Sequence, residues 1–247
     1  MNNYFRFEKK ENDFPFYNDV PDAVAGWKWL VMLLFPFLGL LFLIMVYIPG
    51  LSSYMNELVS GIVLLLSGLL GLKLTVGKNW RLLFRKIHWR DIQLVIGYVL
   101  AAVLIASIIG GIVELVAGPL TDNPLTTKYG DKNALREYFM LRFQEIFQLF
   151  GEEFLAVLPF LAILHFMTVK LNVNRKTVII IAWITSSIIF GLLHLSTYNW
   201  NIIQCIFVIG GSRLLLTLSY IQTKNIWVSY FVHYFYDMLV FTVAFLS

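Results

Sequence analysis

The chain has 247 residues, of which 59% are hydrophobic and 14% are charged, and its formal net charge is +4. Soluble globular proteins carry about 25% charged residues, so this composition excludes a water-soluble globular protein. The positive charge is best interpreted as a topology signal, because basic residues near the ends of hydrophobic stretches mark the cytoplasmic side of a membrane. It gives no support to a nucleic-acid-binding function.

Several stretches approach twenty apolar residues, the length that an α-helix needs to cross the hydrocarbon layer of a bilayer. We therefore expect an all-α fold, a polytopic membrane helix bundle of about seven transmembrane helices. An outer-membrane β-barrel is excluded, because its strands alternate apolar and polar residues and the continuous apolar run 62–66 does not. The expected spans, in chain order, are 28–48, 58–76, 92–118, 143–167, 178–195, 202–221 and 227–246.

Between the second and third spans, segment 78–90 carries five Lys and Arg residues interleaved with aromatic and aliphatic ones. This pattern predicts a basic amphipathic helix on the cytoplasmic membrane surface. It places the amino terminus in the cytoplasm and loop 49–57, which has no Lys or Arg, outside. The connection 119–142, expected outside, contains four basic residues that argue against this orientation. The remaining loops favour it, with 170–176 and Lys224 inside and the uncharged 196–201 outside.

The domain organisation is expected to be simple. Residues 1–27 are mixed polar and aromatic without the pattern of a cleavable signal, so we expect a cytoplasmic amino-terminal segment and a first span that acts as the insertion signal. Residues 28–247 are expected to form a single transmembrane domain, because no internal repeat or soluble boundary is visible. The single cysteine, Cys205, cannot form an internal disulfide and leaves the redox compartment open.

Ionisable residues at membrane depth cost several kcal/mol unless they are paired or hydrated, so each needs a reason to be there. Glu152 and Glu153 are adjacent and point about 100° apart on a helix, so their roles should differ. Two further pairs stand four residues apart on one helix face, where each can line a cavity: Phe190 with His194, and His233 with Asp237. By contrast Glu145, just before the acidic pair, is expected to face the outer interface and to lie outside the site.

Two chemistries are open to these residues. A glutamate in an apolar cavity can act as a general base that takes a proton from water and returns it to a leaving amine. Two imidazoles and a carboxylate also match the ligand set of a catalytic zinc that keeps one position open for water. The residue types alone do not decide between a metal-bound and a metal-free water.

The glutamate pair, the Phe-x-x-x-His motif and the later His-x-x-x-Asp motif, in this order on separate hydrophobic segments, resemble a known family. It is the CAAX prenyl protease and bacteriocin-processing (CPBP) family, also called the Abi family, whose type II CAAX endopeptidase branch cleaves prenylated peptides. The resemblance covers roughly residues 143–247, whereas residues 28–118 match only in being hydrophobic. It implies a multi-pass protease of the bacterial plasma membrane.

The resemblance also implies roles for the motif residues. Glu152 would be the water-activating base and Glu153 its partner. His194 and His233 would bind Zn²⁺ or, without a metal, polarise the scissile carbonyl. Asp237 would complete the oxyanion or metal-ligand site, and Phe190 would contact the substrate.

Two features depart from this scheme. The family's first motif usually reads Glu-Glu-x-x-x-Arg, and its arginine position is Val157 here. We hypothesise that Arg213, which follows Gly210 and Gly211 in the sixth span, supplies the missing cation from another helix. In addition, straight helices would place His194 near the outer end of the fifth span and His233 near the inner part of the seventh, more than about 10 Å apart along the membrane normal. Tilted or broken helices, for example a re-entrant segment 196–211, would be needed to bring them together.

Three functions follow. The first is an intramembrane endopeptidase, a candidate metalloprotease, whose partners are membrane lipids and a hydrophobic or lipidated peptide or membrane-protein substrate. The second is a non-catalytic bacteriocin-immunity or signalling-modulator protein of the same family, which binds a membrane signalling partner. The third, a proton-coupled transporter, is disfavoured because no inverted repeat is visible.

Overall fold

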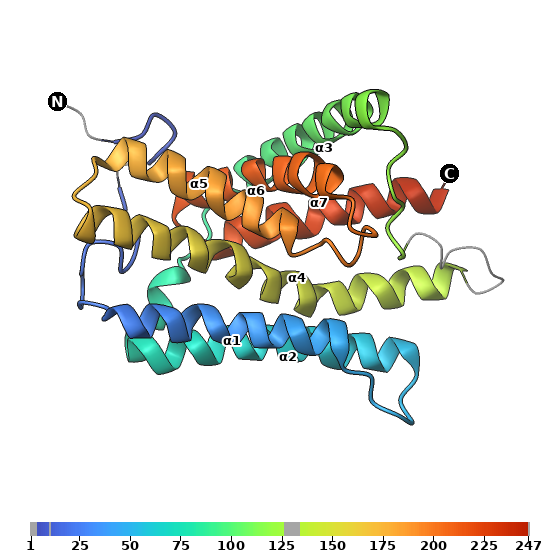
Figure 1. The fold of residues 1–247 in the computed structure, drawn as a ribbon, viewed down its shortest axis with the longest axis horizontal. Coiled ribbons are helices and arrows are strands. Elements are labelled where there is room, and N and C mark those ends of the chain that lie inside the picture. The colour runs from blue at the N-terminus through green and yellow to red at the C-terminus, as the bar shows by residue number, and fades with distance from the viewer. Residues whose placement is uncertain (1–3, 10, 126–133, 247) are drawn as a thin grey trace.

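The computed structural model describes residues 4–9, 11–125 and 134–246. Within these residues the chain forms seven α-helices, joined by loops and short 3₁₀ and π turns, and the described part contains no strand. Helices α1 and α2 pair on one side of the central helix α4, and α5, α6 and α7 lie on its other side, with α3 packed against α6 and α7 (Figure 1). The helices are α1 (Gly26–Met45), α2 (Ser53–Val76), α3 (Trp89–Ala117), α4 (Ala134–His165), α5 (Arg175–Leu192), α6 (Gly210–Thr223) and α7 (Ile226–Leu246).

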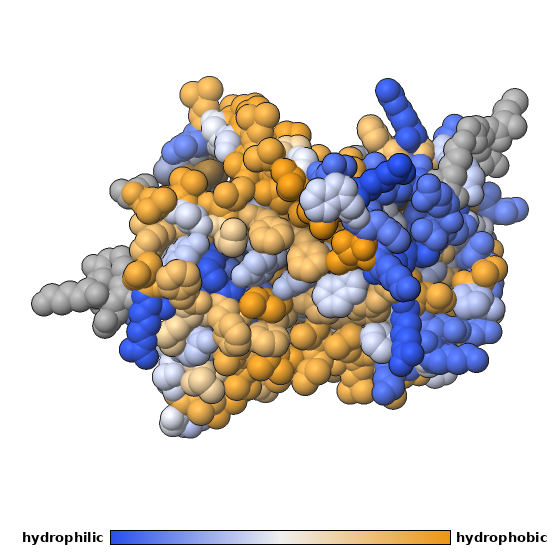
Figure 2. Space-filling model, turned by 180° about the vertical axis from the view of Figure 1, so that it is seen from behind, coloured by the Kyte–Doolittle hydropathy of each residue, from blue (hydrophilic) through white to orange (hydrophobic). Residues whose placement is uncertain are grey.

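Each of the seven expected spans coincides with a helix that is long and apolar enough to cross a membrane. Large apolar side chains point outward along them, including Leu30 on α1 and Leu115 on α3, which are 69% and 86% exposed. Figure 2 shows hydrophobic side chains over most of the visible face, with hydrophilic ones gathered at the end that carries the amino terminus. Such outward apolar surface needs lipid rather than water. The protein is therefore an integral, multi-pass membrane protein, and the expected helical bundle is confirmed.

Helix α4 is the core of the bundle, because both its acidic pair and its apolar residues are buried. Phe154, Val157 and Leu158 have no solvent exposure. Small residues let α2 approach this helix closely: a Cβ atom added to Gly151 would lie 2.6 Å from Leu64 Cγ. The close packing holds the middle of α4, and with it Glu152 and Glu153, at a fixed place inside the membrane domain.

The basic segment 78–90 differs from the helix expected there. Only a 3₁₀ helix, Gly77–Leu83, forms, and Phe84 continues in an extended conformation before α3 begins. The reason is tertiary: the backbone N–H and C=O of Arg85 bond to the side chain of Asn225, at 3.1 and 3.2 Å. A backbone that pairs with a distant side chain in this way cannot also continue a helix.

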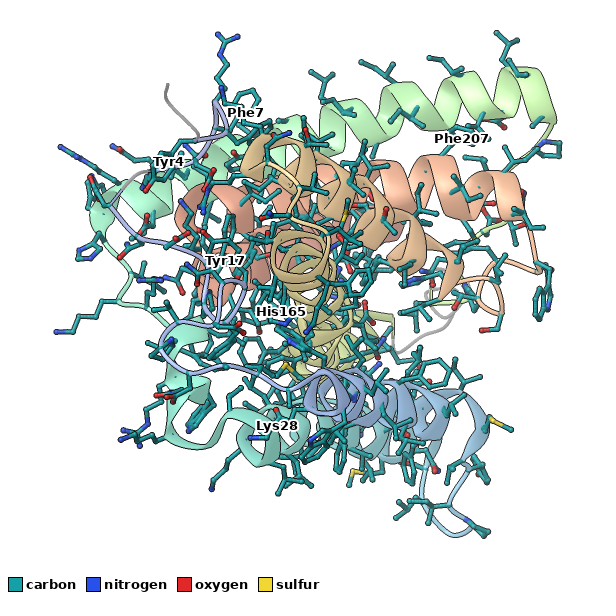
Figure 3. The ribbon with its side chains drawn as sticks, turned by 60° about the vertical axis from the view of Figure 1, so that its left-hand side comes forward. Tyr4, Phe7, Tyr17, Lys28, His165 and Phe207 are labelled. Carbon is teal, nitrogen blue, oxygen red and sulfur yellow. The ribbon has the colours of Figure 1, made fainter. Side chains whose placement is uncertain are left out.

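The amino-terminal segment packs against one end of the bundle, where Figure 3 shows Tyr4, Phe7 and Tyr17. Phe14 and Phe16 are buried in the same core as α4 and α6. The Glu8 carboxylate is buried as well, 2.6 Å from Arg175 and 3.3 Å from Lys224. The segment therefore covers the turn between α6 and α7 and encloses it within the protein.

Candidate active site

Glu152 and Glu153 face different neighbours, as their rotation around α4 requires. Glu153 is fully buried and points toward α6 and α7, whereas Glu152 lines a cavity of about 750 Å³. Gln148, one turn earlier on α4, donates a hydrogen bond of 2.9 Å to Glu152 Oε1. The other carboxylate oxygen, Glu152 Oε2, faces His194 and His233. Sequence reasoning missed Gln148, although its four-residue spacing from Glu152 could have indicated it.

The Glu153 carboxylate is held by four contacts from α6 and α7. Arg213 binds it with both ends of its guanidinium, at 2.6 and 2.9 Å. Ser229 Oγ donates a hydrogen bond of 2.5 Å to Oε2, and His233 Nδ1 lies 2.9 Å from Oε1. A buried charge needs this degree of pairing. Val157, at the family's arginine position, packs in the apolar core instead.

His233 is oriented by Glu153. Because a carboxylate only accepts hydrogen bonds, Nδ1 must carry a proton in the 2.9 Å contact. The 3.3 Å contact between Arg213 Nη1 and Nδ1 is then a contact of two donors and not a hydrogen bond. His233 Nε2 faces the cavity, 4.0 Å from Glu152 Oε2 and 3.8 Å from Asp237 Oδ2.

His194 lies two residues beyond the end of α5 and approaches Glu152 from another direction. Its Nδ1 is 2.9 Å from the carbonyl oxygen of Phe190, so this nitrogen donates. Its Nε2 lies 3.8 Å from Glu152 Oε2. The Phe190 ring packs against both imidazoles, with centroids 4.8 Å from His194 and 5.9 Å from His233. The Phe190 ring therefore contacts both imidazoles that approach the Glu152 carboxylate.

The structure thus brings together side chains that straight helices would hold at different depths. The α6–α7 turn is enclosed in the protein, with Lys224 fully buried and Asn225 2% exposed. Helix α7 starts directly after this connection. His233 lies two helical turns, about 10 Å, further along the axis of α7. Residues 193–200 form turns, and the π helix Gln204–Ile209 precedes α6. His233 thus follows a buried helix start, and His194 lies in the turns that precede the interrupted sixth span.

The cavity extends beyond these residues along α4. Its wall includes six of the seven residues singled out in the sequence, with Glu153 behind it. It also includes Glu145, which is 2% exposed. The expectation that Glu145 faces the outer interface is therefore wrong: residues 120–125 and the start of α2 line the same cavity and cover this part of α4.

The donor atoms do not form a zinc site as they are placed. Ligand atoms on a tetrahedral zinc lie about 3.4 Å from one another, given metal–ligand bonds of about 2.1 Å. Glu152 Oε2 is 3.8 and 4.0 Å from the two histidine nitrogens. In the described residues no three His, Cys, Asp or Glu side chains are grouped so that they could hold a metal ion. The arrangement is suited to acid–base chemistry by Glu152 itself.

A comparison with known families finds one match that spans the motif residues. The model of a family described as type II CAAX prenyl endopeptidase Rce1-like matches residues 134–239. The match contains α4, α5, α6 and most of α7, and with them Glu152, Glu153, Phe190, His194, Arg213, His233 and Asp237. No curated protein and no solved structure matches the chain. Residues 134–239, somewhat less than half of the chain, are therefore similar to the Rce1-like family of type II CAAX prenyl endopeptidases.

Proposed function

We propose that the protein is an intramembrane endopeptidase in which Glu152 activates a water molecule to cut a peptide bond of a hydrophobic or lipidated peptide. One observation carries the proposal: a single carboxylate oxygen, Glu152 Oε2, lies 3.8 Å from His194 Nε2 and 4.0 Å from His233 Nε2 inside a cavity of the bundle. At these separations a water oxygen can lie about 3 Å, a hydrogen-bonding distance, from both Glu152 Oε2 and either histidine nitrogen.

In this mechanism Glu152 removes a proton from the water as the water oxygen attacks the carbonyl carbon of the substrate. His194 Nε2 accepts the second hydrogen of the water and orients it, because Nδ1–H is bonded to Phe190. The carbon–nitrogen bond then breaks, and Glu152 returns its proton to the leaving amine.

His233 stabilises the oxyanion of the tetrahedral intermediate. An oxyanion needs a hydrogen-bond donor, so His233 acts as an imidazolium whose Nδ1–H is bonded to Glu153 and whose Nε2–H is free to donate. The carboxylate of Asp237, 3.8 Å from Nε2, supports this positive charge. Arg213 acts indirectly, because it holds the Glu153 carboxylate that orients the imidazole.

The test is turnover of hydrophobic peptides by the purified protein in lipid vesicles. Glu152→Gln and His194→Ala should each lower kcat by about 10²-fold or more, the usual contribution of a positioned acid or base. The control is Glu137→Gln, the same substitution on the same helix at a position outside the cavity wall, and it should leave kcat unchanged. Unaltered turnover in both Glu152→Gln and His194→Ala would dispose of the mechanism.

The non-catalytic alternative loses its main argument. It relied on Val157 in place of the motif arginine, which would leave the acidic pair without a cation. Arg213 contacts Glu153 from α6 and supplies that cation. The geometry therefore favours the endopeptidase.

We also propose that the end carrying the amino terminus faces the cytoplasm of a bacterial cell, because Arg85, Arg175 and Lys224 gather there. A membrane-impermeant maleimide applied to intact cells should then label Tyr47→Cys, in the α1–α2 loop, and should reach Lys78→Cys only after permeabilisation. The native Cys205 is buried and provides the background. The reverse pattern would invert the topology.

A further inference from the structure

The cavity has a polar wall that the proposed mechanism does not use. Gln144 and Glu145, both 2% exposed, line the same cavity as Glu152. Gln144 Oε1 and Glu145 Oε2 have no hydrogen-bond partner among the described residues. Buried acceptors without a partner are rare and cost about 1 to 3 kcal/mol each, so two neighbouring ones in a cavity wall call for a ligand that donates.

We propose that Gln144 and Glu145 form a substrate subsite that binds a cationic side chain, located about three residues from the bond that is cut. The proposal rests on the endopeptidase function and names its substrate class: a hydrophobic peptide that carries a lysine or arginine. The ammonium or guanidinium group donates to Gln144 Oε1 and to the unpaired oxygen of Glu145.

The charges of the cavity wall favour a cation over an anion. Besides Glu145 and Glu152, Asp122 and Asp237 line the cavity. Within the described wall the only Lys or Arg is Arg213, whose charge is taken up by Glu153. This excess of carboxylates attracts a basic side chain and repels a substrate carboxylate.

The ion pair of Glu145 does not fill the subsite. Arg142 Nη2 lies 2.6 Å from Glu145 Oε1, while the second carboxylate oxygen is buried without a partner, as are Arg142 Nε and Nη1. The Arg142 guanidinium packs over the Phe241 ring at 4.5 Å and is not part of the cavity wall. A purely structural role for this pair would leave the buried Gln144 Oε1 without an explanation.

The distance to the cut bond follows from helix geometry. Glu145 and Glu152 are seven residues apart on one face of α4, which corresponds to about 10 Å along the helix axis. An extended peptide advances about 3.3 to 3.6 Å per residue. A side chain bound at Glu145 therefore belongs to a residue about three positions from the carbonyl that faces Glu152, and the reach of lysine broadens this by about one position on either side.

The experiment compares peptides that are identical except for one residue. A lysine, or the neutral control glutamine, is placed in turn at each position on both sides of the cut bond. For the wild-type protein, lysine at the favoured position should raise kcat/KM about tenfold over glutamine, mainly through a lower KM, as expected for one desolvated charge contact. Equal kcat/KM for lysine and glutamine at every position would overturn the proposal.

Variants assign the preference to the subsite. Glu145→Gln should reduce the lysine-to-glutamine ratio to about one, and Gln144→Met should lower it to an intermediate value. Because Glu145→Gln leaves the buried Arg142 without its partner, the double variant Arg142→Gln with Glu145→Gln removes both charges and should show the same loss. The control Glu137→Gln should retain the full ratio. A preference that survives both Glu145→Gln and the double variant would contradict the assignment.

A binding measurement separates this proposal from the proposed function. Glu152→Gln keeps the subsite intact, and fluorescence anisotropy can report its affinity for labelled lysine and glutamine peptides. If the wild-type protein cuts no peptide but this variant binds the lysine peptide about tenfold more tightly, the endopeptidase proposal fails and the subsite stands. Equal binding of the two peptides would overturn the subsite whatever the outcome of the cleavage assay.

Discussion

Arg213 on α6 and Glu153 on α4 form a two-pronged ion pair, with Nη1–Oε1 and Nη2–Oε2 distances of 2.6 and 2.9 Å. Both side chains are fully shielded from solvent. Glu153 in turn receives Nδ1 of His233 on α7, at 2.9 Å. The pair therefore connects three helices and fixes the imidazole that faces Glu152.

The first prediction concerns this pair. Arg213→Gln should lower kcat by about 10²-fold with little change in KM, because His233 loses its fixed orientation while the cavity wall is otherwise kept. Arg213→Lys should recover only part of the activity, since an ammonium cannot make two parallel bonds to the carboxylate. Steady-state kinetics on protein extracted from membranes measures both. A fully active Arg213→Gln protein would contradict this role.

The second prediction concerns metal ions. Because the atoms around Glu152 lie further apart than zinc ligands do, dialysis against EDTA should leave kcat/KM unchanged. Metal analysis of the same sample shows whether the treatment removed any zinc. Loss of activity that added Zn²⁺ restores would show that the side chains rearrange around a metal.

The third prediction concerns the amino-terminal segment. Glu8→Gln removes the carboxylate shared by Arg175 and the fully buried Lys224, and leaving buried charges without a partner costs about 3 to 5 kcal/mol. Thermal unfolding in detergent, followed by circular dichroism, should show a clearly lower Tm. Glu11→Gln, at an exposed position in the same segment, is the control and should leave Tm unchanged. Equal Tm values for the two variants would show that the ion pairs at Glu8 add no stability.

The fourth prediction is a pH dependence of stability. Burial raises the pKa of Tyr17, in the amino-terminal segment, from 10.0 to about 12, although the nearby Arg175 opposes the shift. Between these two pH values the unfolded chain loses the phenol proton first, so this tyrosine stabilises the fold below pH 10 and its contribution is lost as pH rises toward 12. Tyr17→Phe should therefore flatten the fall of Tm over this range. An unchanged slope would contradict the prediction.

The bundle could be predicted from the sequence because membrane spans follow from local composition. A run of about twenty apolar residues has few alternatives to a transmembrane helix. The candidate residues could be named for a related reason: polar groups such as Glu152 and His194 are conspicuous in such runs. The spacing of Phe190 and His194 also identified two residues that do lie against each other, with ring centroids 4.8 Å apart.

What the sequence could not predict depends on contacts between distant segments. The sequence predicts Glu145 at the interface, because nothing near it indicates that residues 120–125 and the start of α2 line the same cavity. The depth of His233 depends on the burial of Lys224 beneath Glu8, a contact over more than two hundred residues. The course of segment 78–90 is set by Asn225, although its own amphipathic pattern favours a helix.

The central claim is that Glu152 and His194 act on one water molecule as a single unit. A double-mutant cycle on kcat tests it most directly, with Glu152→Gln, His194→Ala and their combination assayed on the same peptide. Because each residue is ineffective without the other, the double variant should be no slower than the slower single variant, within about threefold. Losses that multiply, so that the double variant is slower by the product of the two single effects, would contradict a shared site.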